Sequence, residues 1–74
     1  MSTDKQWENK VKGLLKAELK RKGITYQELA EKLTELGVTE TPENIANKIS
    51  RGKFTAVFLM QCMKAIECTV IRLD

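Results

Sequence analysis

The sequence of 74 residues contains no histidine, a single proline and few aromatic residues. Without histidine, a zinc site would need an unusual set of carboxylates, and the most frequent acid–base group of enzymes is missing. The chain also lacks a glycine-rich phosphate loop and a pair of carboxylates in apolar surroundings. We therefore expect no enzymatic activity, no metal or other cofactor, and no small-molecule substrate.

Long apolar runs are missing as well. No segment approaches the roughly 20 apolar residues that span a bilayer, and no charged, apolar and small-residue leader opens the chain. These absences predict a cytoplasmic protein without a membrane partner.

The two cysteines, Cys62 and Cys68, are six residues apart. On one helix they would point about 240° from each other, so they could not form a disulfide there. Their spacing matches no metal motif. We expect reduced, mostly packed thiols, and an intermolecular disulfide through Cys68 is the alternative.

The length allows one domain, residues 1–74, with one modest core. Apolar residues recur at helical spacing along most of the chain, which argues against strands. The sequence thus predicts an all-α fold, a bundle of four to five helices. Because domains this short are marginal alone, burial through self-association is plausible.

The first predicted helix covers residues 4–22 and the second follows a capping box. In that box, Thr25 and Glu28 satisfy each other's exposed backbone donors. Gly23 and Gly37 are expected helix stops. Two apolar stripes are expected to face the core: Trp7, Val11, Leu14, Leu15 and Leu19 in the first helix, and Leu29, Ala30, Leu33 and Leu36 in the second.

The segment Thr41–Gly52 has the signals of a short third helix. It combines a threonine cap, a proline at the first helical position and a glycine stop. At about 100° per residue, Ile45 and Ile49 share one side of this helix, while polar side chains occupy the other.

The fourth predicted helix, residues 56–67, is apolar almost all round. Such a helix must be buried on more than one side, in the core or against another subunit. Residues 69–74 are expected to form an extended tail or a short helix. The expected dimer interface consists of Leu59, Met60, Met63, Val70 and Ile71.

The segment Gly23–Ala30 resembles the start of the helix-turn-helix in the Cro/phage-repressor-like family, with Gly, an apolar residue, Thr, polar residues and then Leu-Ala. Ile45–Gly52 resembles that family's third helix. The stretch from Ala30 to Ile45 is longer than in that pattern, which predicts a variant helix-turn-helix with a long turn. The chain also resembles a small bacterial family of unknown function that has Trp near the start and an Arg-Gly-Lys-Phe stop.

The repressor-like resemblance implies double-stranded DNA as the partner, read in the major groove by the helix of residues 41–51. Asparagine and arginine pair with adenine and guanine edges, and glutamate accepts from cytosine. Candidate base-reading residues are Glu43, Asn44, Asn47 and Arg51. Candidate phosphate-binding residues are Thr25, Tyr26, Lys48, Ser50 and Lys53. In the alternative interpretation, Asn44 only closes the first turn, and Lys48 and Arg51 favour the helix C-terminus.

Residues 1–24 and 48–74 carry more basic than acidic side chains, whereas residues 25–47 carry more acidic ones. Basic ends around an acidic middle could leave one face positive, which suits a polyanion. The leading hypothesis is a homodimeric, sequence-specific transcriptional regulator. The alternative is a non-enzymatic protein-interaction module, an adaptor or antitoxin-like subunit, that uses the apolar fourth helix.

Overall fold

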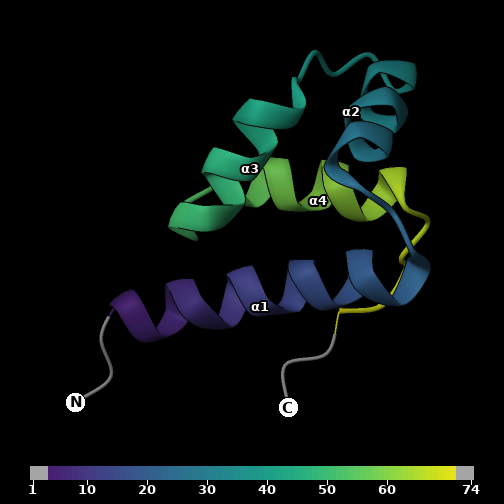
Figure 1. The fold of residues 1–74 in the computed structure, drawn as a ribbon. Helices are drawn as coiled ribbons and strands as arrows, with labels where there is room; N and C mark the ends of the chain where they lie inside the picture. Colours follow the sequence, from purple (N-terminus) through teal and green to yellow (C-terminus); the bar gives the residue numbers. More distant parts are fainter. Residues whose placement is uncertain (1–3, 72–74) are drawn as a thin grey trace.

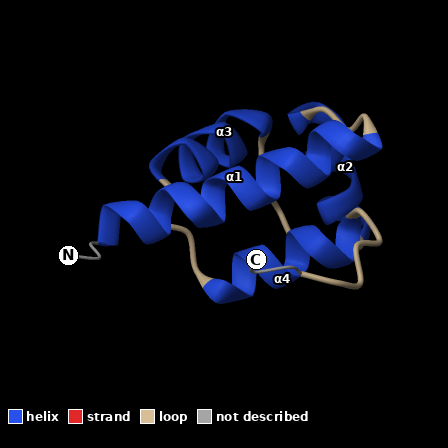
Figure 2. Ribbon diagram, turned by 90° about the horizontal axis from the view of Figure 1, so that it is seen from below, coloured by secondary structure: helices blue, strands red, loops and turns tan. Residues whose placement is uncertain are grey.

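The computed structural model describes residues 4–71, and all regular secondary structure in that range is α-helical (Figures 1 and 2). Four helices follow one another along the chain: α1 Asp4–Lys22, α2 Tyr26–Glu35, α3 Pro42–Arg51 and α4 Ala56–Ala65. The predicted all-α class is therefore confirmed for this part of the chain. None of its helices is long and apolar enough to cross a membrane.

Threonine hydroxyls begin the last three helices. Thr25, Thr41 and Thr55 each accept a hydrogen bond from the backbone N–H three residues later, at 3.1, 3.1 and 3.0 Å. Such caps satisfy backbone donors that the first helical turn leaves unpaired. At the other end of α3, Gly52 adopts φ +68°, the left-handed conformation that stops a helix. The local sequence therefore sets where α2, α3 and α4 begin and where α3 ends.

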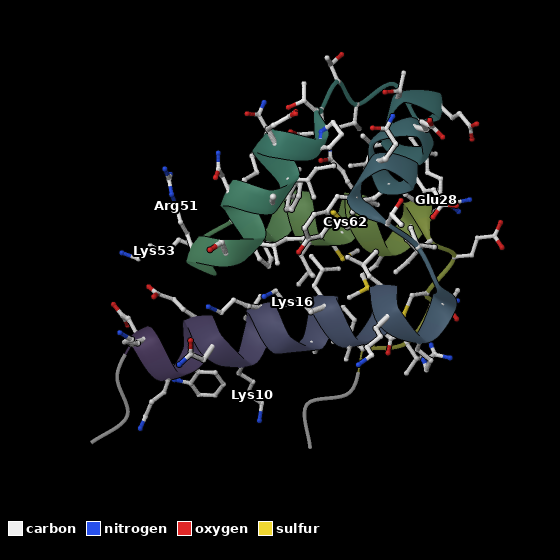
Figure 3. All side chains as sticks on the ribbon, in the orientation of Figure 1. Lys10, Lys16, Glu28, Arg51, Lys53 and Cys62 are labelled. Carbon is white, nitrogen blue, oxygen red and sulfur yellow. The ribbon has the colours of Figure 1, made fainter. Side chains whose placement is uncertain are left out.

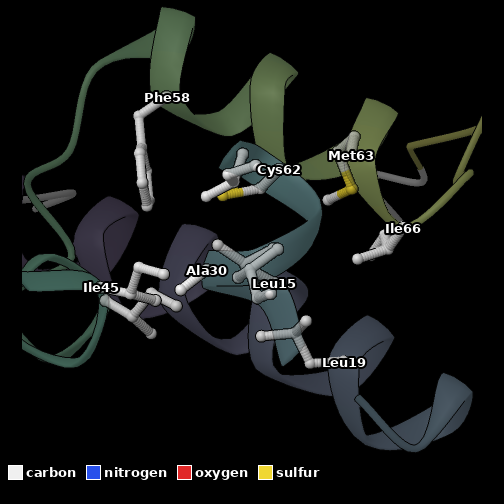
Figure 4. Close-up of a cluster of buried hydrophobic side chains, with 11 residues drawn as sticks. Leu15, Leu19, Ala30, Ile45, Phe58, Cys62, Met63 and Ile66 are labelled. Atoms are coloured by element: carbon white, nitrogen blue, oxygen red, sulfur yellow. The ribbon is translucent and has the colours of Figure 1, made fainter. Parts of the chain in front are cut away.

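The core lies where the four helices meet (Figure 4). α1 runs along one side of the molecule, and α3 packs against both α1 and α2, while α2 also packs against α4 (Figure 1). The fully buried side chains come from all four helices: Leu15, Leu29, Leu33, Ile45, Ile49 and Cys62. The predicted stripes of α1 and α2 thus supply much of the core, although Val11 is only half-buried and two further residues are exposed.

The two exposed residues of these stripes are Trp7, which is 59% exposed, and Leu36, which is 47% exposed. Trp7 belongs to the N-terminal part of α1, which extends beyond the other helices (Figure 1). Leu36 follows the last residue of α2 as its C-cap, so it lies where that helix ends. Helical spacing alone cannot show at which residue each apolar stripe stops being covered by the other helices.

The fourth helix ends at Ala65, two residues before its predicted end. Glu67 adopts φ 58°, and the N–H of Cys68 donates back to the carbonyl of Met63 at 2.8 Å. This left-handed residue turns the chain as a glycine would. Residues 68–71 form neither helix nor strand. The rest of the predicted tail, 72–74, lies outside the described residues.

Gly13 lies inside α1 with open space around it, because a Cβ built there meets nothing within 4 Å. Alanine is favoured over glycine in a helix interior by roughly 0.5–1 kcal/mol. Gly13→Ala is therefore expected to raise the free energy of unfolding by about that amount, measured by urea denaturation. A loss of stability would contradict the open surroundings of this position.

Candidate nucleic-acid interface

The helix α3 has two opposite faces. Ile45 and Ile49 are fully buried, and burying each such side chain stabilises the fold by about 1.5–3 kcal/mol. Asn47 lies between them in sequence and points, at about 100° per residue, to the opposite side. The core contacts therefore fix which side chains of α3 face solvent.

The four candidate base-reading side chains are all exposed: Glu43, Asn44, Asn47 and Arg51. The backbone N–H of Asn44 donates to the Thr41 hydroxyl, which leaves its side-chain amide available. Within residues 4–71, none of the four side chains is engaged in a hydrogen bond or an ion pair. The outer face of α3 thus presents exposed amide, guanidinium and carboxylate groups.

Lys48, a candidate phosphate contact, has a side chain that is 42% exposed and that interacts with neighbouring groups of the same molecule. Its ammonium group pairs with the carboxylate of Glu40, whose side chain is only 8% exposed. The same ammonium lies 4.7 Å from the centre of the Phe58 ring, close enough for a cation–π interaction. Lys48 therefore joins the turn after α2 to α3 and α4, and its charge is largely compensated.

Lys48→Ala is expected to lower the free energy of unfolding by about 1–2 kcal/mol, because Glu40 would keep its charge without a partner. Lys53→Ala provides the matched control. Its ammonium is exposed and lies 3.8 Å from the Glu8 carboxylate, so its loss should cost less than about 0.5 kcal/mol. Equal losses in urea denaturation would contradict the anchoring role of Lys48.

Thr25 and Tyr26 stand at the start of α2. The Thr25 hydroxyl accepts from the Glu28 N–H, and the Glu28 carboxylate accepts from the Thr25 N–H at 2.9 Å. Two hydrogen bonds to the Glu28 carboxylate, first from the Thr25 N–H and then from the Thr25 hydroxyl at 3.2 Å, lower the pKa of Glu28. The predicted capping box is thus confirmed, and it occupies the Thr25 hydroxyl. Tyr26 is half-buried and packs against the core.

The C-terminal end of α3 lies against α1. A Cβ built on Gly52 would come within 2.6 Å of the carbonyl oxygen of Glu8, so the two backbones nearly touch. Ser50 is exposed, and its carbonyl accepts a hydrogen bond from Lys12 Nζ at 3.1 Å. Arg51 and Lys53 both project outward from this end of the helix (Figure 3).

Lys12 is not among the site residues predicted from the sequence. Its contact with Ser50 spans 38 residues, so no local pattern could reveal it. The one sequence signal for Lys12 as a site residue is the helical spacing of lysines on one flank of α1. This signal indicates a site only when α3 is known to lie beside that flank.

The five residues expected at the dimer interface differ in how deeply they are buried. Met60, Val70 and Ile71 are exposed, Leu59 is half-buried, and Met63 is buried in the core of the same chain. Met63 therefore packs into its own core and is only 3% exposed. Val57, which was not selected, is exposed on the same helix as Met60.

Both cysteines are free thiols. Burial first, and then the nearby Glu40 carboxylate, raise the pKa of Cys62 to about 12, so this thiol stays protonated. The Cys68 thiol is half-buried and donates toward the Glu18 carboxylate at 3.5 Å. No group of three potential metal-ligating side chains occurs among residues 4–71.

Comparison with known proteins places this arrangement in a family. No curated protein and no solved structure is significantly similar to the chain. One family does match, over residues 7–71, and its description is a domain of unknown function, DUF6471. The match agrees with the predicted membership in a family of unknown function and does not extend to the Cro/phage-repressor-like family. This chain, with its four helices and exposed polar face on α3, belongs to the DUF6471 family.

Proposed function

We propose that this protein binds double-stranded DNA in a sequence-specific manner, as a small transcriptional regulator that places α3 in the major groove. One observation carries the proposal: α3 buries Ile45 and Ile49 completely, while its opposite face holds four exposed polar side chains that pair with no other side chain within residues 4–71. Such a division leaves a rigid helix with hydrogen-bonding groups on its free side. The proposed activity is binding without catalysis.

The side chains on this face have the chemistry that reads base edges. An asparagine amide can donate to N7 and accept from N6 of adenine in paired geometry, and an arginine can donate to both O6 and N7 of guanine. Asn44 and Asn47 supply the first kind of group, and Arg51 the second. Glu43 can accept from the amino group of cytosine.

The charge around α3 also supports the proposal. Glu40 would add a negative charge beside the reading helix, and its pairing with Lys48 compensates that charge. Arg51 and Lys53 project from the other end of α3 (Figure 3). The candidate repressor-like arrangement, in which α2 and α3 form a variant helix-turn-helix, uses residues 36–41 as its long turn.

Selection from a library of random duplexes tests the proposal. The full chain is expected to enrich one sequence motif, and binding should weaken steeply as salt rises, because phosphate contacts release counterions. Recovery of unenriched sequences at every salt concentration would contradict base reading by α3.

The apolar surface of α4 supports the homodimer, and it is also the surface that the alternative function, a protein-interaction module, would use. Val57 is 65% exposed and Met60 is 63% exposed, although apolar side chains of this kind are normally buried. We propose that a second copy of the chain covers this surface, which would make a DNA-binding homodimer. A two-fold dimer presents two reading helices to an inverted-repeat site.

The protein is expected to sediment as a dimer at micromolar concentration, and Met60→Lys should shift it to a monomer because a charge would enter the apolar interface. Lys64→Ala, a change at an exposed residue of the same helix, serves as the control. A wild-type monomer in sedimentation velocity would reject the homodimer and leave this surface to another protein.

A further inference from the structure

One flank of α1 carries lysines and no acidic side chain. Lys5, Lys12 and Lys20 lie within about 40° of Lys16 around the helix axis, as their spacing requires. The nearest carboxylate on this helix, Glu8, is about 80° from Lys16 and about 40° from Lys12. It lies 3.8 Å from the ammonium of Lys53, and Asp4 and Glu18 are further from Lys16. We call this set of four residues, Lys5, Lys12, Lys16 and Lys20, the lysine flank.

The lysine flank faces the same side of the molecule as the start of α2 and the end of α3. Lys12 Nζ donates to the Ser50 carbonyl of α3 at 3.1 Å. Lys16 and Lys20 border one shallow surface hollow, whose other lining residues are Leu19, Ile24, Thr25 and Tyr26. Lys5, Lys16 and Lys20 are exposed. Lys10, by contrast, extends from the opposite side of α1, away from α3 and α4 (Figure 3).

We propose that the lysine flank binds the phosphate backbone of a duplex beside the groove that α3 enters. This inference rests on the proposed DNA-binding function and assigns a second contact surface to it. Lysine ammonium groups act as compact charges that attract phosphates irrespective of sequence. From Lys5 to Lys20 the flank is about 22 Å long, so it can follow several phosphates of one strand.

The composition of the flank favours a nucleic acid over a membrane surface. Helices that lie on membranes place large apolar side chains beside their basic residues. The apolar residues of α1 that lie nearest to the lysine flank, Leu15 and Leu19, are buried in the core. Asn9 is the exposed residue between Lys5 and Lys12 on this flank. A hydrophilic polyanion is therefore the partner that fits.

Two matched double variants test the inference by the salt dependence of duplex binding. Lys16→Gln with Lys20→Gln removes charge from the lysine flank, and Lys10→Gln with Lys22→Gln removes equal charge from other sides of the same helix. Each pair contains one lysine of the helix interior and one of the last turn. Effects on the helix dipole are therefore matched.

The flank variant should reduce the slope of log K against log salt by about 1–2, since each phosphate contact contributes roughly 0.9. The sequence preference should stay the same, and the control pair should keep the wild-type slope. An unchanged slope in the flank variant, or equal reductions in both pairs, would overturn the inference.

The results distinguish a failure of phosphate binding by the lysine flank from a failure of base reading by α3. The wild-type chain could enrich a motif while the flank variant keeps the wild-type slope of log K against log salt. That result would reject phosphate binding by the lysine flank and leave base reading by α3 standing. Unselective duplex binding that weakens only in the flank variant supports the flank and rejects base reading by α3. Absence of any duplex binding at low salt rejects both.

Discussion

Gly52→Ala is expected to destabilise the protein by about 2–4 kcal/mol. Two costs combine at this position. The backbone has φ +68°, which an alanine adopts only with strain, and the new Cβ would lie 2.6 Å from the Glu8 carbonyl oxygen and 3.0 Å from its carbonyl carbon. Because both neighbouring atoms are backbone atoms of α1, neither can rotate away.

Gly23→Ala is the matched control, since Gly23 has the same φ of +68° but nothing within 4 Å of a Cβ. It should lose only about 1 kcal/mol through backbone strain. The difference between the two variants in urea denaturation measures the close approach of α3 to α1. Equal losses would show that α1 and α3 are further apart than described.

Replacing both Asn47 and Arg51 with alanine is expected to abolish sequence preference while leaving the fold intact. Each paired contact to a base edge is worth about 1–3 kcal/mol of discrimination, or roughly 5- to 150-fold. Both side chains are exposed and make no contact that supports the core. Unfolding should therefore change by less than about 0.5 kcal/mol. Library selection with the double variant provides the measurement.

Lys10→Ala is the control for the lost charge, because this exposed lysine extends away from α3 (Figure 3). It should retain the wild-type motif and lose only a small part of the affinity. If the Asn47 and Arg51 variant selects the same motif as the wild type, these residues do not read bases.

The beginnings of the short helices could be predicted because their signals are local. Thr25, Thr41 and Thr55 accept from backbone groups three residues away, and Gly52 stops α3 through its own conformation. The sides of α3 were likewise predictable, because Ile45 and Ile49 recur at helical spacing.

The partners of individual charges could not be predicted, because they depend on how the helices pack. Lys48 has the sequence context of a surface lysine, yet Glu40, in the turn eight residues earlier, holds it over Phe58 of another helix. The hydrogen bond between Lys12 and Ser50 joins two helices far apart in sequence. Helical periodicity predicts which residues share one face of a helix. It does not predict which residues of other helices that face contacts.

Met63 illustrates the same limit for apolar residues. Its helix has apolar side chains on nearly every side, so spacing did not decide whether Met60 or Met63 faces the core. The structure buries Met63 and exposes Met60. The choice depends on where α2 lies against α4, which is a tertiary contact.

Titration of the isotope-labelled chain with its selected duplex tests the central claim most directly, by following amide proton–nitrogen correlation spectra. We expect the largest shifts in the side-chain amides of Asn44 and Asn47 and in the backbone amides of α3, with smaller shifts along the lysine flank. Shifts confined to Val57 and Met60 of α4, with α3 unchanged, would contradict the assignment of α3 as the reading helix.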